Sequence, residues 1–362
     1  MDFGLSEDQL LLEDTVRKFL AEQVPIERVR ELRERDCPYD REIWTALAEL
    51  GVTGILVPEA QGGSGLALLD AALVAESLAR AATPAPFLAT AIMAPIALKA
   101  VGGGDAEAWM SAIAGGELVV GVAATELFSV REDAGVRLSG GKLAGKAMMA
   151  LDAHGAGLLL VAVDPTTLAA VKTDAPGVAI ERLKTLDATR CTAEVVFDGA
   201  AAEAVFEGAG EAIRRMLEAG RIALAADTLG CCESMVEQAV AYAKERKQFE
   251  RVIGSFQAVK HMCSEMIAEV EPARSLLWYS AHSFDAMPDE APLMACHALA
   301  HLSEIGREIA SVSTQVHGGI GWTDEQNLHF WFKRVGNARH LLGGPEALRQ
   351  RAAELQGFAT NT

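Results

Sequence analysis

Apolar residues recur at helical spacing in the first part of the chain, from Ser6 to about Gly115. The opening residues Ser6-Glu7-Asp8-Gln9 form a capping-box pattern, in which the Ser and Gln side chains satisfy free amides at a helix start. Further helices are expected around residues 42–50 and 68–81, with a turn between them at the Pro and paired Gly of residues 58–65. We therefore predict an N-terminal helical domain over residues 1–116.

The pattern changes to short apolar runs between about Glu117 and Phe206. These runs are rich in β-forming residues and are separated by Gly, Asp and Pro; they read LVVGVAA, GVRLSGGKLAG, GLLLVAV, GVAIERL and TAEVVF. Such runs predict a small β-barrel or sandwich, here a middle β domain over residues 117–208.

Helical periodicity returns near Gly210 and continues to the end of the chain. Two long apolar stripes suit packing between helices, one formed by Ile222, Ala225, Leu229, Val236, Ala239 and Ala243 and the other by Phe256, Val259, Cys263, Met266 and Val270. We predict a C-terminal helical bundle over residues 209–362. The fold class expected is therefore mainly α with a middle β domain.

The charge and apolar content of the chain argue against some classes of binding partner. The 362 residues carry 32 Lys and Arg against 50 Asp and Glu, and this net charge of −18 repels nucleic acid and anionic lipid. No uncharged run approaches the roughly 18 to 20 apolar residues that a membrane span needs. The six Cys contain no CxxC pair and the first residues lack a secretion-signal pattern, so a reduced, cytoplasmic setting is expected.

The stretch ERKQFERVIGSFQAVKHM, residues 245–262, places a guanidinium and an aromatic ring near a helix end. Arg246 and Phe249 lie three apart and could face the same way, the first suited to a phosphate or ribose and the second to an adenine. Gln257 is expected to open the next helix, near the unsatisfied amides of its first turn. Alone, such an Arg is more often a surface ion pair and such a Phe a core residue.

The stretch QVHGGIGWT, residues 315–323, leaves backbone bare just before a second capping pattern. Glycine lets N–H groups approach a pyrophosphate without interference from a Cβ. Thr323-Asp324-Glu325-Gln326 is then expected to cap the following helix. A lone GGxG would more often be a turn, so this stretch gains meaning only beside the first.

With both motifs in order, and with LGVTGILVPEAQGGSGL at residues 50–66, the chain resembles the acyl-CoA dehydrogenase family of flavoproteins over nearly its whole length. The resemblance implies that family's fold, with a C-terminal four-helix bundle, and FAD as cofactor. In the family, these motifs bind the adenosine and pyrophosphate half of an FAD seated in a neighbouring subunit. The implied cofactor-binding residues are Arg246, Gln248, Phe249, Gln257, Gln315, Val316, His317, Gly318 and Gly319.

Family members oxidise an acyl-CoA between C2 and C3, with a Glu carboxylate that removes the C2 proton while a hydride passes to the flavin. The corresponding stretch here is HLLGGPEALRQ, which puts Gly343, or Leu342 with a one-residue slip, at the Glu position. Some members carry the Glu just before an Arg on an earlier helix, and here Gly220 precedes Arg221. The resemblance therefore implies no catalytic carboxylate at either position.

Two nearby carboxylates, Glu346 and Glu218, fall three and two residues from the family positions. On a helix this displacement points a side chain elsewhere, so both are expected to be solvated helix-surface carboxylates. His297 and His301 have a metal-compatible spacing but no evident third ligand, so no metal site is expected.

The β domain also departs from the family pattern. In ATELFSVREDAGV, Thr125 and Glu126 remain without the family's Gly-Ser-Asp. In KAMMALD, Met148 and Ala150 replace an aromatic residue and a hydroxyl residue. These are the elements that, by resemblance, contact the flavin ring and the substrate.

Three hypotheses follow. The first is a base-lacking subunit of a heteromeric (α2β2) acyl-CoA dehydrogenase, like those with which bacteria degrade steroids, which completes the FAD site of a homologous catalytic subunit and uses electron-transfer flavoprotein as acceptor. The second is a self-sufficient homo-oligomeric enzyme with Glu346 or Glu218 as a displaced base. The third is a flavin-free scaffold or acyl-CoA-binding protein of the same fold.

Overall fold

The computed structural model describes residues 4–35, 39–129 and 131–358. The N-terminal region is helical, and its capping box is confirmed: Gln9 N donates to Ser6 Oγ at 3.2 Å and Ser6 N donates to Gln9 Oε1 at 3.0 Å. Its helices are α1 (Glu7–Gln23), α2 (Ile26–Arg33), α3 (Arg41–Glu49), α4 (Leu68–Arg80), the π-helical segment η2 (Leu88–Met93), α5 (Ala94–Val101) and α6 (Gly104–Ala114).

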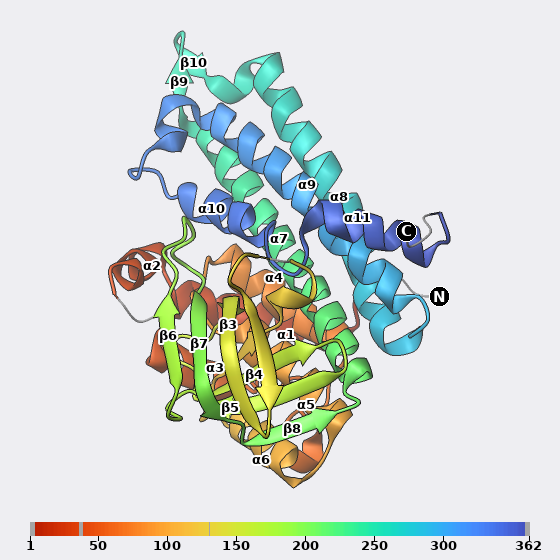
Figure 1. The fold of residues 1–362 in the computed structure, drawn as a ribbon. Coiled ribbons are helices and arrows are strands. Elements are labelled where there is room, and N and C mark those ends of the chain that lie inside the picture. The colour runs from red at the N-terminus through yellow and green to blue at the C-terminus, as the bar shows by residue number, and fades with distance from the viewer. Residues whose placement is uncertain (1–3, 36–38, 130, 359–362) are drawn as a thin grey trace.

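The middle region is one mixed sheet, below the helical bundle in Figure 1. Its strand order is β6-β7-β3-β1-β4-β5-β8, with β2 paired to β3, and only the β1–β4 pair is parallel. The strands are β1 (Val120–Ala123), β2 (Gly135–Ser139), β3 (Lys142–Leu151), β4 (Leu158–Asp164), β5 (Thr167–Lys172), β6 (Val178–Arg182), β7 (Thr192–Ala201) and β8 (Ala204–Glu207). The five expected runs correspond to six of these strands, with β2 and the start of β3 in a single run, whereas β5 and β8 were not anticipated.

Long helices form the C-terminal region, as expected. They are α7 (Gly210–Glu245), α8 (Gln257–Ala286), α9 (Ala291–His317), α10 (His329–Ala338) and α11 (Gly344–Leu355), with a short hairpin of β9 (Lys247–Gln248) and β10 (Arg251–Val252) after α7. The first predicted apolar stripe is buried throughout. In the second stripe only Met266 and Val270 are buried, so the first half of α8 lies at the edge of the chain's own core.

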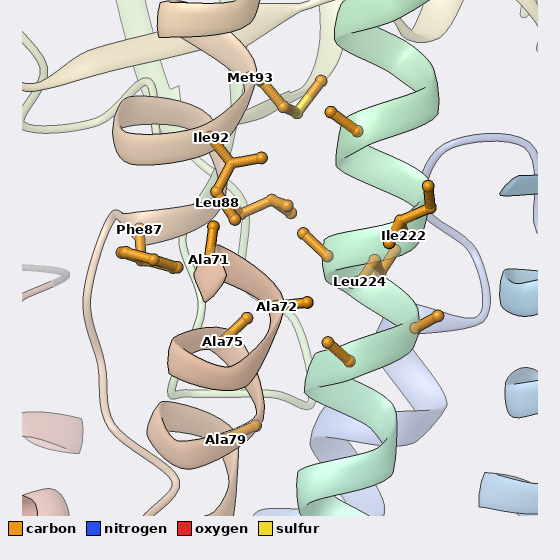
Figure 2. Close-up of a cluster of buried hydrophobic side chains, with 14 of the residues drawn as sticks. Ala71, Ala72, Ala75, Ala79, Phe87, Leu88, Ile92, Met93, Ile222 and Leu224 are labelled. Carbon is orange, nitrogen blue, oxygen red and sulfur yellow. The ribbon is translucent and has the colours of Figure 1, made fainter. Parts of the chain in front are cut away.

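Close packing of α4 against α7 fixes the position of α7. Ala71, Ala72, Ala75 and Ala79 present a row of small side chains along α4 (Figure 2). A Cβ at Gly230 would lie 2.1 Å from the carbonyl oxygen of Glu76, so the two backbones meet there. Among the described helices, none combines the length and apolar character needed to cross a membrane.

Candidate functional site

A hairpin after α7 carries the first predicted motif. The helix ends at Glu245, and β9 pairs with β10 around a tip formed by Phe249 and Glu250. The expectation that Arg246 and Phe249 share a helix end is therefore wrong: Arg246 is the extended residue after the helix, and Phe249 lies in the hairpin turn. Ile253 N donates to Arg246 O at 2.8 Å and closes the hairpin at its base.

The tip of this hairpin is strained and bare. Phe249 and Glu250 both have positive φ, 52° and 64°, a region that costs non-glycine residues of order 1–3 kcal/mol each. Phe249 is 86% exposed, and its ring forms an edge-type pair with that of Phe256, with the centroids 6.1 Å apart. Within the described residues the exposed guanidinium of Arg246 has no ion-pair partner. Among the described residues, the exposed ring, the unpaired cation and the strained turn make this tip a candidate for contact with a molecule outside the chain.

Gln257 is the first residue of α8, as expected. Phe256, the residue before it, offers no side-chain cap, so amides of the first helical turn point outward without a partner from that side chain. Gln248 is exposed on the hairpin and donates only to the neighbouring Lys247 carbonyl oxygen. The hairpin and the start of α8 thus form one exposed segment. It carries side-chain amide donors and the N-terminus of a helix, where the helix dipole is positive.

The glycine loop follows α9. Gly318 has a φ of 69° at the helix end, and neither Gly318 nor Gly319 has an atom within 4 Å of where a Cβ would lie. Both are exposed, as is Gln315, so their backbone faces open space. Gly321 differs, because a Cβ there would lie 2.9 Å from the Thr314 carbonyl oxygen. Two of the three glycines therefore leave backbone accessible, and the third packs on α9.

The side chain of His317 turns inward. It is 3% exposed, its Nδ1 donates to Ser313 O at 2.8 Å, and its ring stacks on Tyr242 at 4.7 Å. Burial lowers the pKa of His317, so the ring is neutral near pH 7. Val316 is also buried. For these two predicted residues only the backbone is available to a ligand, while the Tyr242–His317 stack joins the end of α7 to the end of α9.

The predicted cap at residues 323–326 is wrong. The next helix, α10, begins at His329 with Leu328 before it and no side-chain cap. Asp324 instead pairs with cations of α2, at 2.7 Å from Arg33 Nη1. A long-range ion pair has taken the place of the local capping bond.

Gly220 and Gly343, the two positions that the family resemblance implies for a carboxylate, both lie next to Leu342: Gly343 follows it in sequence and Gly220 faces its side chain. A Cβ on Gly220 would lie 2.9 Å from Met93 Sδ and 3.1 Å from Leu342 Cδ1. Figure 2 shows Met93 reaching from η2 toward α7. Leu342 is buried with a φ of 54°, and its carbonyl oxygen accepts a 3.1 Å hydrogen bond from Arg221 Nε. Apolar side chains therefore fill the space beside Gly220.

Gly343 has a φ of 116°, outside the conformations that side-chain-bearing residues adopt readily. A Cβ there would lie 3.5 Å from Leu348 Cδ2 and 3.8 Å from Arg221 Nη2, ordinary contact distances. Space for a small side chain is present at this position, but the backbone selects glycine.

The displaced carboxylates have different surroundings. Glu346 is exposed and pairs with Arg339 at 2.9 Å, as the sequence predicts for a helix-surface carboxylate. Glu218 is only 2% exposed, so the expectation that it is solvated is wrong. Its Oε1 pairs with Arg214 Nη1 at 2.7 Å, and burial raises its pKa against the opposing effect of Arg214.

Two cavities flank α7. An open cavity of about 290 Å³ lies beside the first half of α7 and is lined by Arg214, Glu218, Arg221, Cys296, Arg351 and neighbouring residues. No carboxylate of the described chain lies within ion-pair distance of Arg221. On the other side, between α4, η2 and α7, a cavity of only about 20 Å³ remains beside Ala75, Phe87 and Ile92. The second space is too small for an acyl chain.

In the β domain, the Glu126 carboxylate is held by a hydrogen bond within the chain. Its Oε1 accepts a 2.7 Å hydrogen bond from Met148 N, so the carboxylate is directed at the chain's own backbone. Met149 has a φ of 54°, at an irregularity in the β3–β7 register between Ala147 and Ala150. The fully buried Ala150 offers no hydroxyl. Sequence reasoning identified these positions but gave no indication of the Glu126–Met148 bond.

Comparisons with known proteins agree with this fold. A family model described as acyl-CoA dehydrogenase, N-terminal domain, matches residues 6–117, and one described as acyl-CoA dehydrogenase, C-terminal domain, matches residues 207–355. The acyl-CoA dehydrogenase IpdE2 of Mycolicibacterium smegmatis is 30% identical over 97% of this chain and 100% of its own length.

Two solved structures are similar over nearly the whole chain. The Tcur3481–Tcur3483 steroid ACAD G363A variant has a TM-score of 0.87 and 27% identity, covering 97% of this chain and 98% of that one. The ChsE4–ChsE5 complex from Mycobacterium tuberculosis has a TM-score of 0.90 at 24% identity, covering 100% of both chains, a likeness of fold.

Proposed function

This chain belongs to the acyl-CoA dehydrogenase family, and we propose that it acts as a base-lacking subunit of a heteromeric enzyme, completing the FAD site of a catalytic partner. The observation that carries the proposal is an asymmetry. The hairpin tip and the glycine loop face outward with an exposed guanidinium, an exposed ring and exposed glycine backbone, whereas the two positions that the family resemblance implies for the carboxylate are glycine.

The outward surface fits the adenosine and pyrophosphate half of FAD. Phe249 offers a ring for stacking, Arg246 a cation for a phosphate or ribose, and Gly318 and Gly319 open N–H groups. Gln257 adds a side chain at a helix N-terminus, where the dipole favours an anion. FAD supplies hydride acceptance when bound, and the part assigned to this chain is to hold and orient its nucleotide end in the neighbouring subunit.

The chain's own pocket fits a flavin and substrate poorly. Leu342 and Met93 occupy the space at Gly220, and Glu126 is engaged by the Met148 amide. Proton abstraction at C2 therefore has no carboxylate at the family positions, and we assign it to the partner's Glu. Electron-transfer flavoprotein is the proposed acceptor, by family resemblance.

A bulky acyl-CoA, such as a steroid-derived thioester, is the proposed substrate class. Its basis is the similarity to the Tcur3481–Tcur3483 steroid ACAD, a steroid enzyme named for two proteins. Assaying the complex with a steroid acyl-CoA and with a straight-chain acyl-CoA tests this point, and faster turnover of the straight chain contradicts it.

The direct experiment compares this chain alone with the chain co-purified with a Glu-bearing homologue. We expect little flavin alone and a yellow, active complex. Arg246→Ala should weaken FAD retention by the complex, whereas the control Lys244→Ala, an exposed cation two residues earlier, should not. A lone chain with a full flavin complement that oxidises an acyl-CoA would refute the heteromer.

One observation favours a self-sufficient enzyme as second candidate. Glu218 is buried, has a raised pKa and lines the 290 Å³ cavity, and these properties suit a general base. Glu218→Gln in the isolated chain tests this candidate. If the wild-type chain turns over alone and the variant does not, while its flavin is retained, Glu218 is the base.

A further inference from the structure

Two arginines of the N-terminal helix α2 hold the turn that follows the glycine loop. Arg30 and Arg33 lie three apart in the last turns of α2, on one face. The turn, residues 323–328, joins the 3-10 helix η5 (Gly318–Trp322) to α10. Figure 1 shows α2 beside the α10 end of the C-terminal bundle.

The guanidinium of Arg30 makes several hydrogen bonds to this turn. Its Nε and Nη2 donate to Asn327 Oδ1 at 3.0 and 2.8 Å, and Nη2 also donates to the Asp324 carbonyl oxygen at 2.6 Å. Its Nη1 donates to Asp324 Oδ2 at 3.2 Å. One side chain therefore binds two side chains and one backbone carbonyl, which fixes the turn in a single conformation.

Arg33 adds the charge pairing. Its Nη1 donates to Asp324 Oδ1 at 2.7 Å, and this bond is the main reason that the pKa of Asp324 is lowered to about 2. Both guanidinium groups also lie over the buried Phe330 ring, at 5.4 and 5.8 Å from its centroid. We call these contacts of Arg30 and Arg33 with residues 324–330 the α2 clamp.

The clamp begins at Asp324, shortly after the 3-10 helix η5, which opens with the exposed backbone of Gly318 and Gly319. On the other side of that backbone, the stack of His317 on Tyr242 fixes the end of α9. Gly318 and Gly319 are thus held at both ends while remaining uncovered. Glycine has the largest conformational freedom of any residue, so anchoring its flanks removes motion that a ligand would otherwise have to suppress.

We propose that Arg30 and Arg33 are positioning residues for nucleotide binding: the N-terminal domain sets the conformation of the glycine loop without touching the cofactor. That FAD is the ligand of this loop rests on the proposed function above. Loss of either arginine should loosen the loop and raise the FAD dissociation rate of the complex about tenfold.

The first test needs no cofactor. Hydrogen–deuterium exchange of the full chain should show faster exchange of the amides in residues 318–328 for Arg30→Gln and Arg33→Gln. Arg33→Lys should restore part of the protection, because a lysine keeps the charge that pairs with Asp324 at 2.7 Å but loses the second, 3.5 Å bond from Nη2. The matched control is Arg28→Gln, on the same helix, whose guanidinium pairs with Asp40 at 2.7 Å and not with the turn.

The second test measures FAD release from the complex by flavin fluorescence. The inference is overturned if Arg30→Gln leaves both loop exchange and FAD release unchanged, or if Arg28→Gln changes them equally, since general loosening of α2 then explains the effect. Arg246→Ala separates the two proposals. If Arg246→Ala releases FAD and Arg30→Gln does not, only the clamp proposal fails. If Arg246→Ala, like Arg30→Gln, leaves FAD in place, the proposed function fails and the clamp has no nucleotide to position.

Discussion

Restoring a carboxylate at residue 343 should not restore an enzyme. Gly343 has φ and ψ of 116° and −21°, and a side chain in such a region costs about 1–3 kcal/mol. Space is not the limit, because the nearest atom to a Cβ would be Leu348 Cδ2 at 3.5 Å. The strain therefore arises at the backbone, and Gly343→Ala and Gly343→Glu should be destabilised by similar amounts.

Urea unfolding of both variants measures that cost, with the Ala variant isolating the backbone contribution from the charge. Flavin absorbance and reduction of an electron acceptor by an acyl-CoA then test activity. We expect neither variant to turn over alone, because Met148 and Ala150 still replace the residues that, by family resemblance, contact the flavin ring and substrate, and Leu342 still fills the space beside Gly220.

Two results would refute this reasoning. If Gly343→Ala is as stable as the parent chain, the backbone conformation at residue 343 does not require glycine. If Gly343→Glu alone binds FAD stoichiometrically and oxidises an acyl-CoA, only the carboxylate was missing, and the division of labour between subunits is unnecessary.

Three further changes test buried contacts, two on α7 and one at Asp152, whose carboxylate accepts a hydrogen bond from Ala89 N in η2. Gly220→Ala should lower the free energy of unfolding by about 1 kcal/mol in urea titrations, because overpacking against the buried Met93, 2.9 Å away, outweighs the gain in helix propensity; a stabilised variant contradicts this. Asp227→Asn should cost about 3–5 kcal/mol, since it breaks the buried 2.6 Å pair with Arg334 and leaves that cation uncompensated; a loss below 1 kcal/mol argues against it. Burial raises the pKa of Asp152 to about 6, so ionisation of Asp152 lowers the stability of the fold as pH rises from about 4 through 6. Asp152→Asn should remove this loss of stability in thermal unfolding curves measured across that pH range. An unchanged dependence of stability on pH in the variant contradicts the role of Asp152.

Local patterns predicted the helices well and the sheet less completely. The box at Ser6 and the start of α8 at Gln257 depend on neighbours within four residues, which a sequence displays directly. Strand β8 is a short edge strand of three half-buried residues and one exposed residue, and β5 is a run of four buried residues between polar ends. Neither has an alternating pattern strong enough to distinguish it from a loop.

The hairpin at Phe249 illustrates a different failure. Helical spacing suggested that Arg246 and Phe249 project together, yet the helix ends at Glu245 and the tip adopts positive φ. Nothing in the local residue preferences favours Phe-Glu at such a turn, where Asn-Gly is usual. The surrounding pairing of β9 with β10 imposes it.

The sequence by itself determined the order of the three regions, the two motifs proposed to bind a nucleotide and the glycines at residues 220 and 343, because these are matters of residue identity and short-range periodicity. Only the tertiary structure decided that Met93 and Leu342 close the space beside Gly220, and that Asp324 binds α2 instead of capping α10. These partners lie more than a hundred residues apart, so their contacts depend on how packed helices bring distant segments together.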